Sequence, residues 1–335
     1  MQLILDTNGL IVKQRNQCFQ IIFGETEKLI APTKITSIAV TKNCLLSSSA
    51  MILAAQNRIP IYFVDGIGKV LSTARSASFD SLSTIRRKQV FFNHTSDATN
   101  WILSIFSEKN KQELETLRWL INIRKLAKDE INQGIETLIE FQKYLENIPF
   151  QELTVEDIRP QLLGKEGSSA RQYWEAVSAC LPEHFIFENR TRRPATDPFN
   201  AALNYLYGML YTTVENAIWS AGLDPYLGIF HVDEYNAPTL SFDLIETFRP
   251  WADRFLIEAF LDGFFDNTFV DVKQNNAHVL NSKGKSWLIP AWNEYLLVKE
   301  RMEDFQVSRK NAIHRMADNL RNQIEDVKIP SEMIK

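Results

Sequence analysis

Cysteine is scarce in this 335-residue sequence, which contains only Cys18, Cys44 and Cys180. Their number is odd and no two of them form a CxxC pair, so the sequence predicts neither a disulfide framework nor a zinc knuckle. This usage is typical of proteins in a reducing cytoplasm, and we expect a cytoplasmic location.

Long apolar runs and export signals are also missing. The N-terminal sequence MQLILDTNGLIV has a short apolar stretch without a basic region before it or a small-residue cleavage site after it. No apolar run approaches the ~20 residues that cross a bilayer. We therefore expect no membrane partner.

Positive charge is not in excess, because the formal net charge is −4. This balance argues mildly against polyanion binding over the whole surface, although a local basic patch can still hold phosphate groups. Nucleic-acid contacts must therefore be argued from individual patches.

Hydrophobic residues make up 45% of the sequence, enough for a sizeable core. Residues 1–80 contain strand-length runs rich in β-branched and aromatic residues, separated by turn signals. Between Lys109 and Asn147, apolar residues recur at three- and four-residue spacing, as in amphipathic helices. The sequence predicts an α+β fold, with a small β-rich domain over residues 1–85 and a larger all-α domain over residues 86–335.

Two short motifs give local predictions. Asn8-Gly9 lies between two strand-like runs and predicts a two-residue hairpin, because both central positions of a type I′ turn need positive φ.

Asp197-Pro198 predicts a helix start, since Asp caps free backbone N–H groups and Pro is tolerated at the first position. Gly222 suits the left-handed position that ends this helix.

Residues 229–246, IFHVDEYNAPTLSFDLIE, place a histidine and two acids around a Pro-containing turn. Asp243 and Glu246 are three residues apart, so on a helix their carboxylates share a face. Acids near a helix start are common, because the partial positive charge there favours them, and this pair alone indicates little. His231 strengthens the case, since imidazole beside carboxylates is a plausible set of divalent-metal ligands.

Another acid lies in GKEGSSARQYW, residues 164–174, where Glu166 stands between glycines at the expected head of a helix. Glycines beside an acid allow the close approach of a backbone or ligand. The alternative is that Glu166 is an ordinary acid in the first turn of a helix and that Gly164 and Gly167 are loop residues. Spacing does not show that Glu166 meets His231, so the residues alone leave both interpretations open.

Three longer runs resemble the CRISPR-associated integrase, the catalytic subunit of the spacer-acquisition complex. They are EGSSARQYW, DPFNAALNYLYGMLYTTVENAIWSAGLDPYLGIFH and LSFDLIETFRPWADR. The resemblance covers essentially the whole chain, and it implies an N-terminal β-domain followed by a helical catalytic domain. Two details depart from the commonest pattern: some members carry Asp where Glu246 stands, and Leu206 fills a place that a small residue often takes.

The resemblance implies a metal site made by a Glu, a His and a third acid. These roles fall on Glu166, His231 and Glu246, with Asp243 beside the site and assisting it as a fourth catalytic residue. The implied ion is Mg²⁺ or Mn²⁺: a set with one imidazole accepts Mn²⁺ readily, whereas Mg²⁺ prefers oxygen and keeps waters.

The implied reaction joins a DNA 3′-hydroxyl to a phosphodiester, which inserts prespacer DNA into a CRISPR repeat. The motifs contain no cysteine or serine nucleophile signature, so we expect direct displacement without a covalent enzyme intermediate. By the same resemblance, the chain is expected to form a homodimer through its β-rich domain and to assemble with a small ferredoxin-like partner subunit.

The expected contacts to double-stranded DNA are mainly to phosphates, because prespacer sequences vary. Six basic residues are candidates for these contacts: Lys165, Arg171, Arg190, Arg192, Arg193 and Arg249. Arg249 has an alternative role as an ion-pair partner of Glu246 or Asp253. The three arginines between residues 190 and 193 form either a solvated loop or a DNA contact that orders on binding.

Two other functions are compatible with the residues. One is a stand-alone metal-dependent nuclease with the same site, which strand joining would distinguish. The other is a non-catalytic DNA-binding scaffold in which Glu166, His231 and Glu246 are structural. Retained DNA binding with lost activity in Glu166→Ala would exclude the scaffold.

Overall fold

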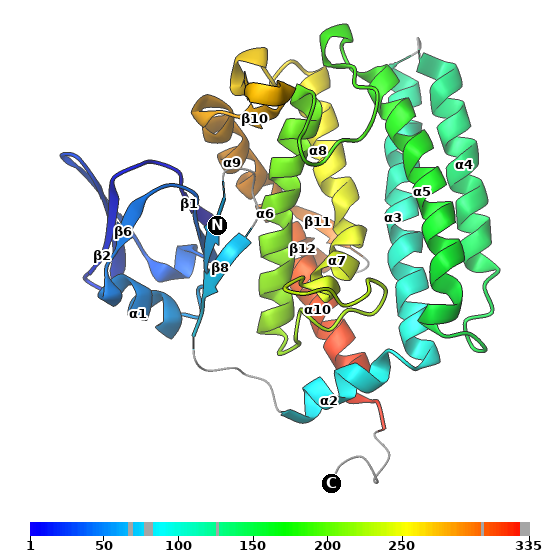
Figure 1. The fold of residues 1–335 in the computed structure, drawn as a ribbon, viewed down its shortest axis with the longest axis horizontal. Coiled ribbons are helices and arrows are strands. Elements are labelled where there is room, and N and C mark those ends of the chain that lie inside the picture. The colour runs from blue at the N-terminus through cyan, green and yellow to red at the C-terminus, as the bar shows by residue number, and fades with distance from the viewer. Residues whose placement is uncertain (66–69, 77–82, 125–126, 303–304, 329–335) are drawn as a thin grey trace. The chain divides into compact units, whose positions relative to one another are not determined.

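The computed structural model describes residues 1–65, 70–76, 83–124, 127–302 and 305–328, and Figure 1 shows its helices and strands. The chain forms two compact units. Residues 1–80 and 282–309 make up the first unit, and residues 81–281 and 310–335 make up the second. The predicted single boundary at residue 85 therefore misses a segment that returns to the N-terminal unit.

The first unit contains two four-stranded sheets. One has the order β4-β3-β2-β6, with β2 (Leu10–Arg15), β3 (Cys18–Phe23), β4 (Thr26–Ile30) and β6 (Cys44–Leu46). The other has the order β1-β5-β7-β8, with β1 (Gln2–Leu5), β5 (Ser37–Val40), β7 (Ile61–Val64) and β8 (Val70–Ala74). The helix α1 (Ser48–Gln56) and the 3₁₀ turn η1 (Pro32–Lys34) complete this part. Apolar residues of both sheets and of α1, among them Val12, Ile38 and Leu53, bury their side chains in one core.

Asn8-Gly9 does not form the predicted hairpin. The flanking strands lie in different sheets, because β1 pairs in parallel with β5 whereas β2 pairs with β3. Gly9 has the expected positive φ of 83°, but its N–H donates to Asn43 O at 2.8 Å. The prediction is wrong because the motif specifies the local turn, whereas the pairing partner depends on which faces the strands bury.

The segment that returns to the first unit begins with α9 (Ser282–Leu297) and continues into the antiparallel pair β11 (Lys299–Met302) and β12 (Phe305–Ser308). The side chain of Asn293 on α9 accepts a hydrogen bond from Gln2 N at 3.1 Å and donates one to Gln2 O at 3.3 Å. These bonds join residues 291 positions apart. No local pattern in the sequence signals a contact of that range.

The second unit is mainly helical. Its helices are α2 (Ser83–Phe92), α3 (Ser96–Ile123), α4 (Lys128–Glu146), α5 (Val155–Cys180), α6 (Pro198–Ser220), α7 (Thr239–Ile245), α8 (Arg249–Leu261) and α10 (Arg309–Glu325). Short 3₁₀ turns are η3 (Glu183–Phe185), η4 (Glu246–Phe248), η5 (Asn267–Phe269) and η6 (Gln274–Asn276). A two-stranded hairpin, β9 (Val270–Val272) with β10 (His278–Leu280), adds strands to the domain that was expected to be all α. The α+β fold class is confirmed.

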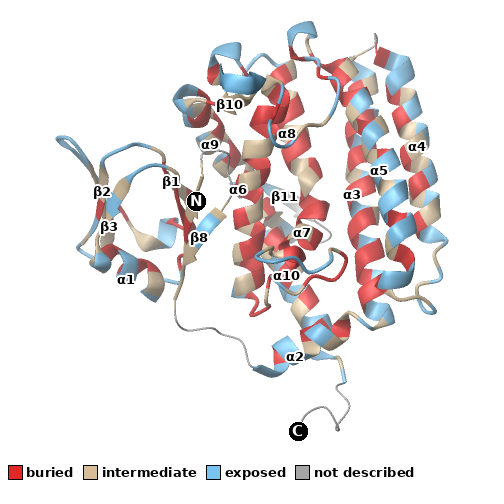
Figure 2. Ribbon diagram, in the orientation of Figure 1, coloured by how far each residue is buried: buried red, intermediate tan, exposed pale blue. Residues whose placement is uncertain are grey.

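Helix α3 lies at the centre of this unit, since it packs against α4, α5, α8 and η4. Figure 2 shows buried residues along most of α3, whereas α4 presents a partly exposed face. The predicted helical region from Lys109 to Asn147 is confirmed and consists of the second half of α3 followed by α4. Because α3 is surrounded, even polar residues on it are buried, and they must find partners inside the unit.

Other local predictions are also confirmed. The Asp197 side chain caps α6 by accepting a hydrogen bond from Asn200 N at 2.7 Å, and Gly222 follows the helix with a φ of +81°. All three cysteines are free thiols. In the described part of the chain, no helix is long and apolar enough to cross a membrane.

Replacing Asp197 with Ala should destabilise the protein by about 1 kcal/mol, because the first turn of α6 loses its side-chain acceptor. Urea unfolding followed by circular dichroism would measure the loss. Asp197→Asn keeps an acceptor oxygen and should lose less stability. Equal losses in both variants would contradict a capping role.

Candidate active site

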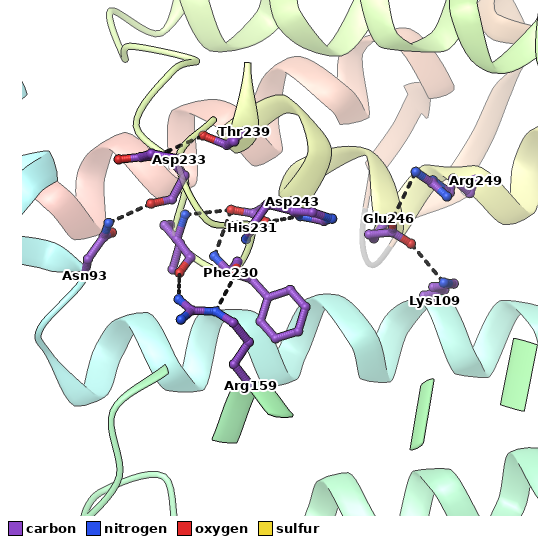
Figure 3. Close-up of polar contacts among 12 residues, drawn as sticks. Asn93, Lys109, Arg159, Phe230, His231, Asp233, Thr239, Asp243, Glu246 and Arg249 are labelled. Atoms are coloured by element: carbon purple, nitrogen blue, oxygen red, sulfur yellow. Dashed lines mark hydrogen bonds and ion pairs between the residues drawn. The ribbon is translucent and has the colours of Figure 1, made fainter. Parts of the chain in front are cut away.

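The loop between α6 and α7 has its backbone fixed by side chains from other helices. Gln89 of α2 donates to Asp224 O at 2.7 Å, and Asn93, just after α2, donates to Gly228 O at 2.6 Å. Arg159 of α5 donates from Nε to Phe230 O at 2.7 Å (Figure 3). These three contacts anchor the loop up to the residue before His231.

Close packing inside the loop explains the glycine at position 228. A Cβ atom there would lie 2.6 Å from His231 O and 2.7 Å from Thr239 Cβ, which is closer than real Cβ atoms approach. Only glycine lets the loop fold back on itself at this point. The glycine therefore helps to set the position of His231.

Asp243 organises the same loop from inside. Its buried carboxylate accepts backbone N–H groups from Ile229 at 2.7 Å, Phe230 at 3.0 Å and His231 at 2.9 Å. Its Oδ1 also lies 2.6 Å from Nδ1 of the His231 ring (Figure 3). A carboxylate in this position holds the ring and favours a proton on Nδ1, which leaves a lone pair free on Nε2.

Glu166 and Glu246 meet around the side chain of Lys109, a residue of α3. The Lys109 Nζ atom lies 2.6 Å from Glu166 Oε1 and 2.8 Å from Glu246 Oε2. Burial alone would lower the pKa of Lys109, but the surrounding carboxylates outweigh this effect and raise the pKa above its ordinary value. Lys109 is therefore buried and charged, and its ammonium contacts the carboxylates of two of the predicted ligands.

Arg249 holds the other oxygen of Glu246. Its Nη2 lies 3.1 Å from Glu246 Oε1 and donates to the Tyr211 hydroxyl at 2.7 Å. Burial would raise the pKa of Glu246, but Arg249, Lys109 and His231 favour the charged form and lower the pKa to about 2. The structure thus shows the ion pair that was the alternative to a DNA contact for Arg249.

Glu166 lies in the middle of α5, not at the predicted head of a helix. The helix begins earlier, where Thr154 and Asp157 form a reciprocal capping box. A Cβ atom on Gly164 or Gly167 would meet nothing within 4 Å, so these glycines do not serve a close approach. The prediction is wrong because packing of α5 against α3 and α4 sustains a helix through two glycines.

A pocket adjoins Lys109 and Glu166, and basic residues form part of its lining: Arg171, Arg190, Arg192 and Arg249. Arg190 is fixed in place, because it donates to Asn200 Oδ1 and Asn204 Oδ1, both at 2.7 Å. It therefore does not belong to a solvated loop. Arg192, Arg193 and Arg171 are exposed, and so is Lys165, whose ammonium lies 5.8 Å from the centre of the Tyr144 ring.

Two further buried acids, Glu113 and Asp253, line this pocket. Neither was among the predicted site residues, although Asp253 was a candidate ion-pair partner of Arg249. Burial raises the pKa of Glu113 to about 8 and that of Asp253 to about 7. The Tyr207 hydroxyl donates to Asp253 Oδ1 at 2.6 Å. Their only sequence signal is that each follows a site residue by one helical turn, Glu113 after Lys109 and Asp253 after Arg249.

Within the described ranges, no three His, Cys, Asp or Glu side chains are arranged as a ready metal-binding group. The Lys109 ammonium lies between Glu166 and Glu246 instead. Asp243 already binds the backbone of the loop and the His231 ring. The residues nevertheless suit a divalent ion, because two carboxylates that share one cation beside an oriented imidazole form a mixed O,N ligand set.

Comparison with known proteins identifies the family. The model of the family described as CRISPR associated protein Cas1 matches residues 3–294. The chain belongs to the Cas1 family. It is 29% identical over 254 residues to CRISPR-associated endonuclease Cas1 1 of Archaeoglobus fulgidus, covering 72% of this chain and 70% of that one. It is 30% identical over 227 residues to CRISPR-associated protein Cas1 3 of Methanobrevibacter ruminantium, covering 68% and 67%.

Solved structures agree with a Cas1 fold. A CAS1 protein from Thermotoga maritima matches with a TM-score of 0.76 and 21% identity, covering 98% of each chain. A casposase bound to integration product matches with a TM-score of 0.78 and 20% identity, covering 98% of this chain and 92% of that one. At these identities the likeness concerns the fold alone.

Replacing Gly228 with Ala should destabilise this Cas1-family chain by about 1–3 kcal/mol, because the added methyl group overpacks the loop against Thr239. Gly164→Ala is the matched control, since its methyl group meets open space and should stabilise α5 by about 0.5–1 kcal/mol. Urea unfolding of both variants measures the difference. Similar effects in the two variants would contradict the close packing.

Glu113 should make stability depend on pH. Its pKa is higher in the folded chain than in the unfolded chain, so its contribution is complete below about pH 4 and is lost as the pH rises toward 8. Between about pH 6 and pH 8, the unfolding free energy of the native protein should fall more steeply with pH than that of Glu113→Gln. The difference should be about 1 kcal/mol per pH unit. Urea unfolding at several pH values measures this slope. The exposed Glu115→Gln should leave it unchanged, and an unchanged slope in Glu113→Gln would contradict a raised pKa.

Proposed function

We propose that this chain is a metal-dependent DNA integrase and endonuclease that inserts prespacer DNA into a CRISPR array. The observation that carries the proposal is the convergence of Glu166 and Glu246 on one cation, next to a histidine whose Nδ1 is held by Asp243. His231 is near enough to Glu246 to lower its pKa. Membership of the Cas1 family supports the same function.

Glu166, His231 and Glu246 are the residues that would hold the ion, through carboxylate oxygens and the imidazole Nε2. A bound Mg²⁺ or Mn²⁺ would act as a Lewis acid and as a template for in-line displacement at phosphorus. A ligand set with one imidazole accepts Mn²⁺ readily, whereas Mg²⁺ would keep several waters, so either ion fits.

Neighbouring side chains orient the proposed ligands before DNA binds. Asp243 fixes the ring of His231, and Arg249 restrains one oxygen of Glu246 while the other oxygen contacts Lys109. Preorganised ligands do not have to be reoriented during the reaction, which lowers its barrier. Asp243 acts as a positioning residue in this mechanism.

The DNA would lie along the pocket beside Glu166. Arg171 and Arg192 are exposed on its lining and are suited to phosphate oxygens, while Lys165 and Arg193 lie nearby in the sequence. Arg190 and Arg249 contribute positive charge from fixed positions. Contacts of this kind bind arbitrary DNA sequences, as prespacer capture requires.

The proposed assembly contains a homodimer formed through the strand-rich unit and a small ferredoxin-like partner subunit. A structural neighbour that is described as a Cas6-RT-Cas1–Cas2 complex supports the presence of a partner subunit; it has a TM-score of 0.77 and 20% identity, and the match covers 97% of this chain and 35% of that one. The homodimer and the ferredoxin-like fold of the partner rest on the family resemblance alone. The casposase neighbour, described as bound to integration product, supports strand joining in place of cutting alone.

A strand-transfer assay tests the function. It uses supercoiled DNA with a CRISPR repeat, a labelled duplex prespacer, Mg²⁺ or Mn²⁺ and the partner subunit. His231→Ala should lower joining by more than ~100-fold, because losing a ligand exceeds the ~10–100-fold cost typical of an outer-shell partner. His278→Ala, in the β9–β10 hairpin, is the matched control and should join normally.

Two results would contradict the proposal. Cutting without joining in the native protein would indicate a stand-alone nuclease, an activity that the name endonuclease on relatives also allows. DNA binding without any reaction in the native protein would indicate a scaffold whose site residues are structural.

A further inference from the structure

The Lys109 side chain occupies the position that a bridging metal ion would need. Its ammonium contacts one oxygen of Glu166 and one of Glu246, and only 8% of the side chain is exposed. Arg249 contacts Glu246 through the opposite oxygen, at 3.1 Å, and is held there by Tyr211. Of these two cations, Lys109 is the one that joins the two carboxylates (Figure 3 shows its contact with Glu246).

Electrostatics explain why a cation belongs at this position. Two carboxylates that converge in a poorly hydrated site repel each other and lose hydration, so an uncompensated pair would be strongly destabilising. One ammonium between them offsets both effects. A divalent ion would offset them as well, but it cannot use the same oxygens while the ammonium is there, because two like charges would share one position.

We infer that Lys109 is a built-in competitor of the metal: its ammonium keeps Glu166 and Glu246 together in the metal-free protein and leaves them when an ion binds. The inference rests on the proposed function, since it takes these residues as the ligands. Lys109 then sets the affinity for the metal, because metal binding exchanges one cation for another.

The structure offers the displaced ammonium another place. Lys109 itself lines the pocket beside Glu166, so its ammonium has space to move away from the two carboxylates. A lysine side chain has a flexible four-carbon stem, so its ammonium can move while the helix stays in place. The exchange therefore requires side-chain rotation alone.

Affinity for Mn²⁺ without DNA tests the inference, by isothermal titration or by the electron paramagnetic resonance of free Mn²⁺. In Lys109→Met the dissociation constant should fall at least tenfold, and the metal-free protein should melt at a lower temperature. Lys109→Arg keeps a cation and should bind Mn²⁺ about as the native protein does. Lys111→Met removes the same charge from an exposed position on α3 and should leave the constant unchanged within twofold.

The outcomes separate the inference from the proposed function. If the native protein binds Mn²⁺, His231→Ala abolishes binding and Lys109→Met binds no more tightly than the native protein, the metal site stands and the competitor role is overturned. If neither the native protein nor Lys109→Met binds Mn²⁺, the metal site and the inference both fail.

Chemical labelling of the native protein gives a second readout that does not depend on the folding of a variant. Reductive methylation modifies accessible amines, and peptide mass spectrometry reports each lysine separately. Mn²⁺ should increase methylation of Lys109 several-fold while that of Lys111 stays constant. Methylation of Lys109 that does not respond to Mn²⁺ would overturn the inference.

Discussion

The loss of hydration by carboxylates inside the helical unit is the constraint on which the site depends. Asp243, Glu246 and Glu113 are all buried, and each solves the problem differently. Asp243 accepts three backbone N–H groups, Glu246 lies between two cations, and the burial of Glu113 favours its protonated form. Three buried acids of the same unit therefore have three different roles.

The same constraint links the fold to the chemistry. Helix α3 is enclosed by its neighbours, so Lys109 and Glu113 on it are largely shielded from water and need partners inside the unit. The loop before α7 has the same dependence, because its backbone amides need Asp243. A change in one buried charge therefore alters loop geometry, stability and ligand arrangement together, and measurements on single residues will not be additive.

Local signals were the part of the fold that the sequence predicted well. Asp197-Pro198 and Gly222 correctly bounded α6, because a cap and a C-terminal glycine act on backbone groups next to them. The pairing of the strands around Asn8-Gly9 and the return of the segment after residue 281 were not predicted, because strand partners and unit membership depend on distant contacts. Three ligand candidates came from motifs and family resemblance, whereas Lys109 lies 57 positions before Glu166 and inside an ordinary amphipathic pattern.

The return of residues 282–309 to the first unit has a consequence for synthesis on the ribosome. The N-terminal strands emerge early, but the helix that bonds to β1 emerges only after almost all of the helical unit. The helical unit itself lacks α10 until still later. Neither unit can finish folding until residues after 281 have been made, so the two units complete their folding at nearly the same time, and the bond from Gln2 of β1 to Asn293 is missing until then.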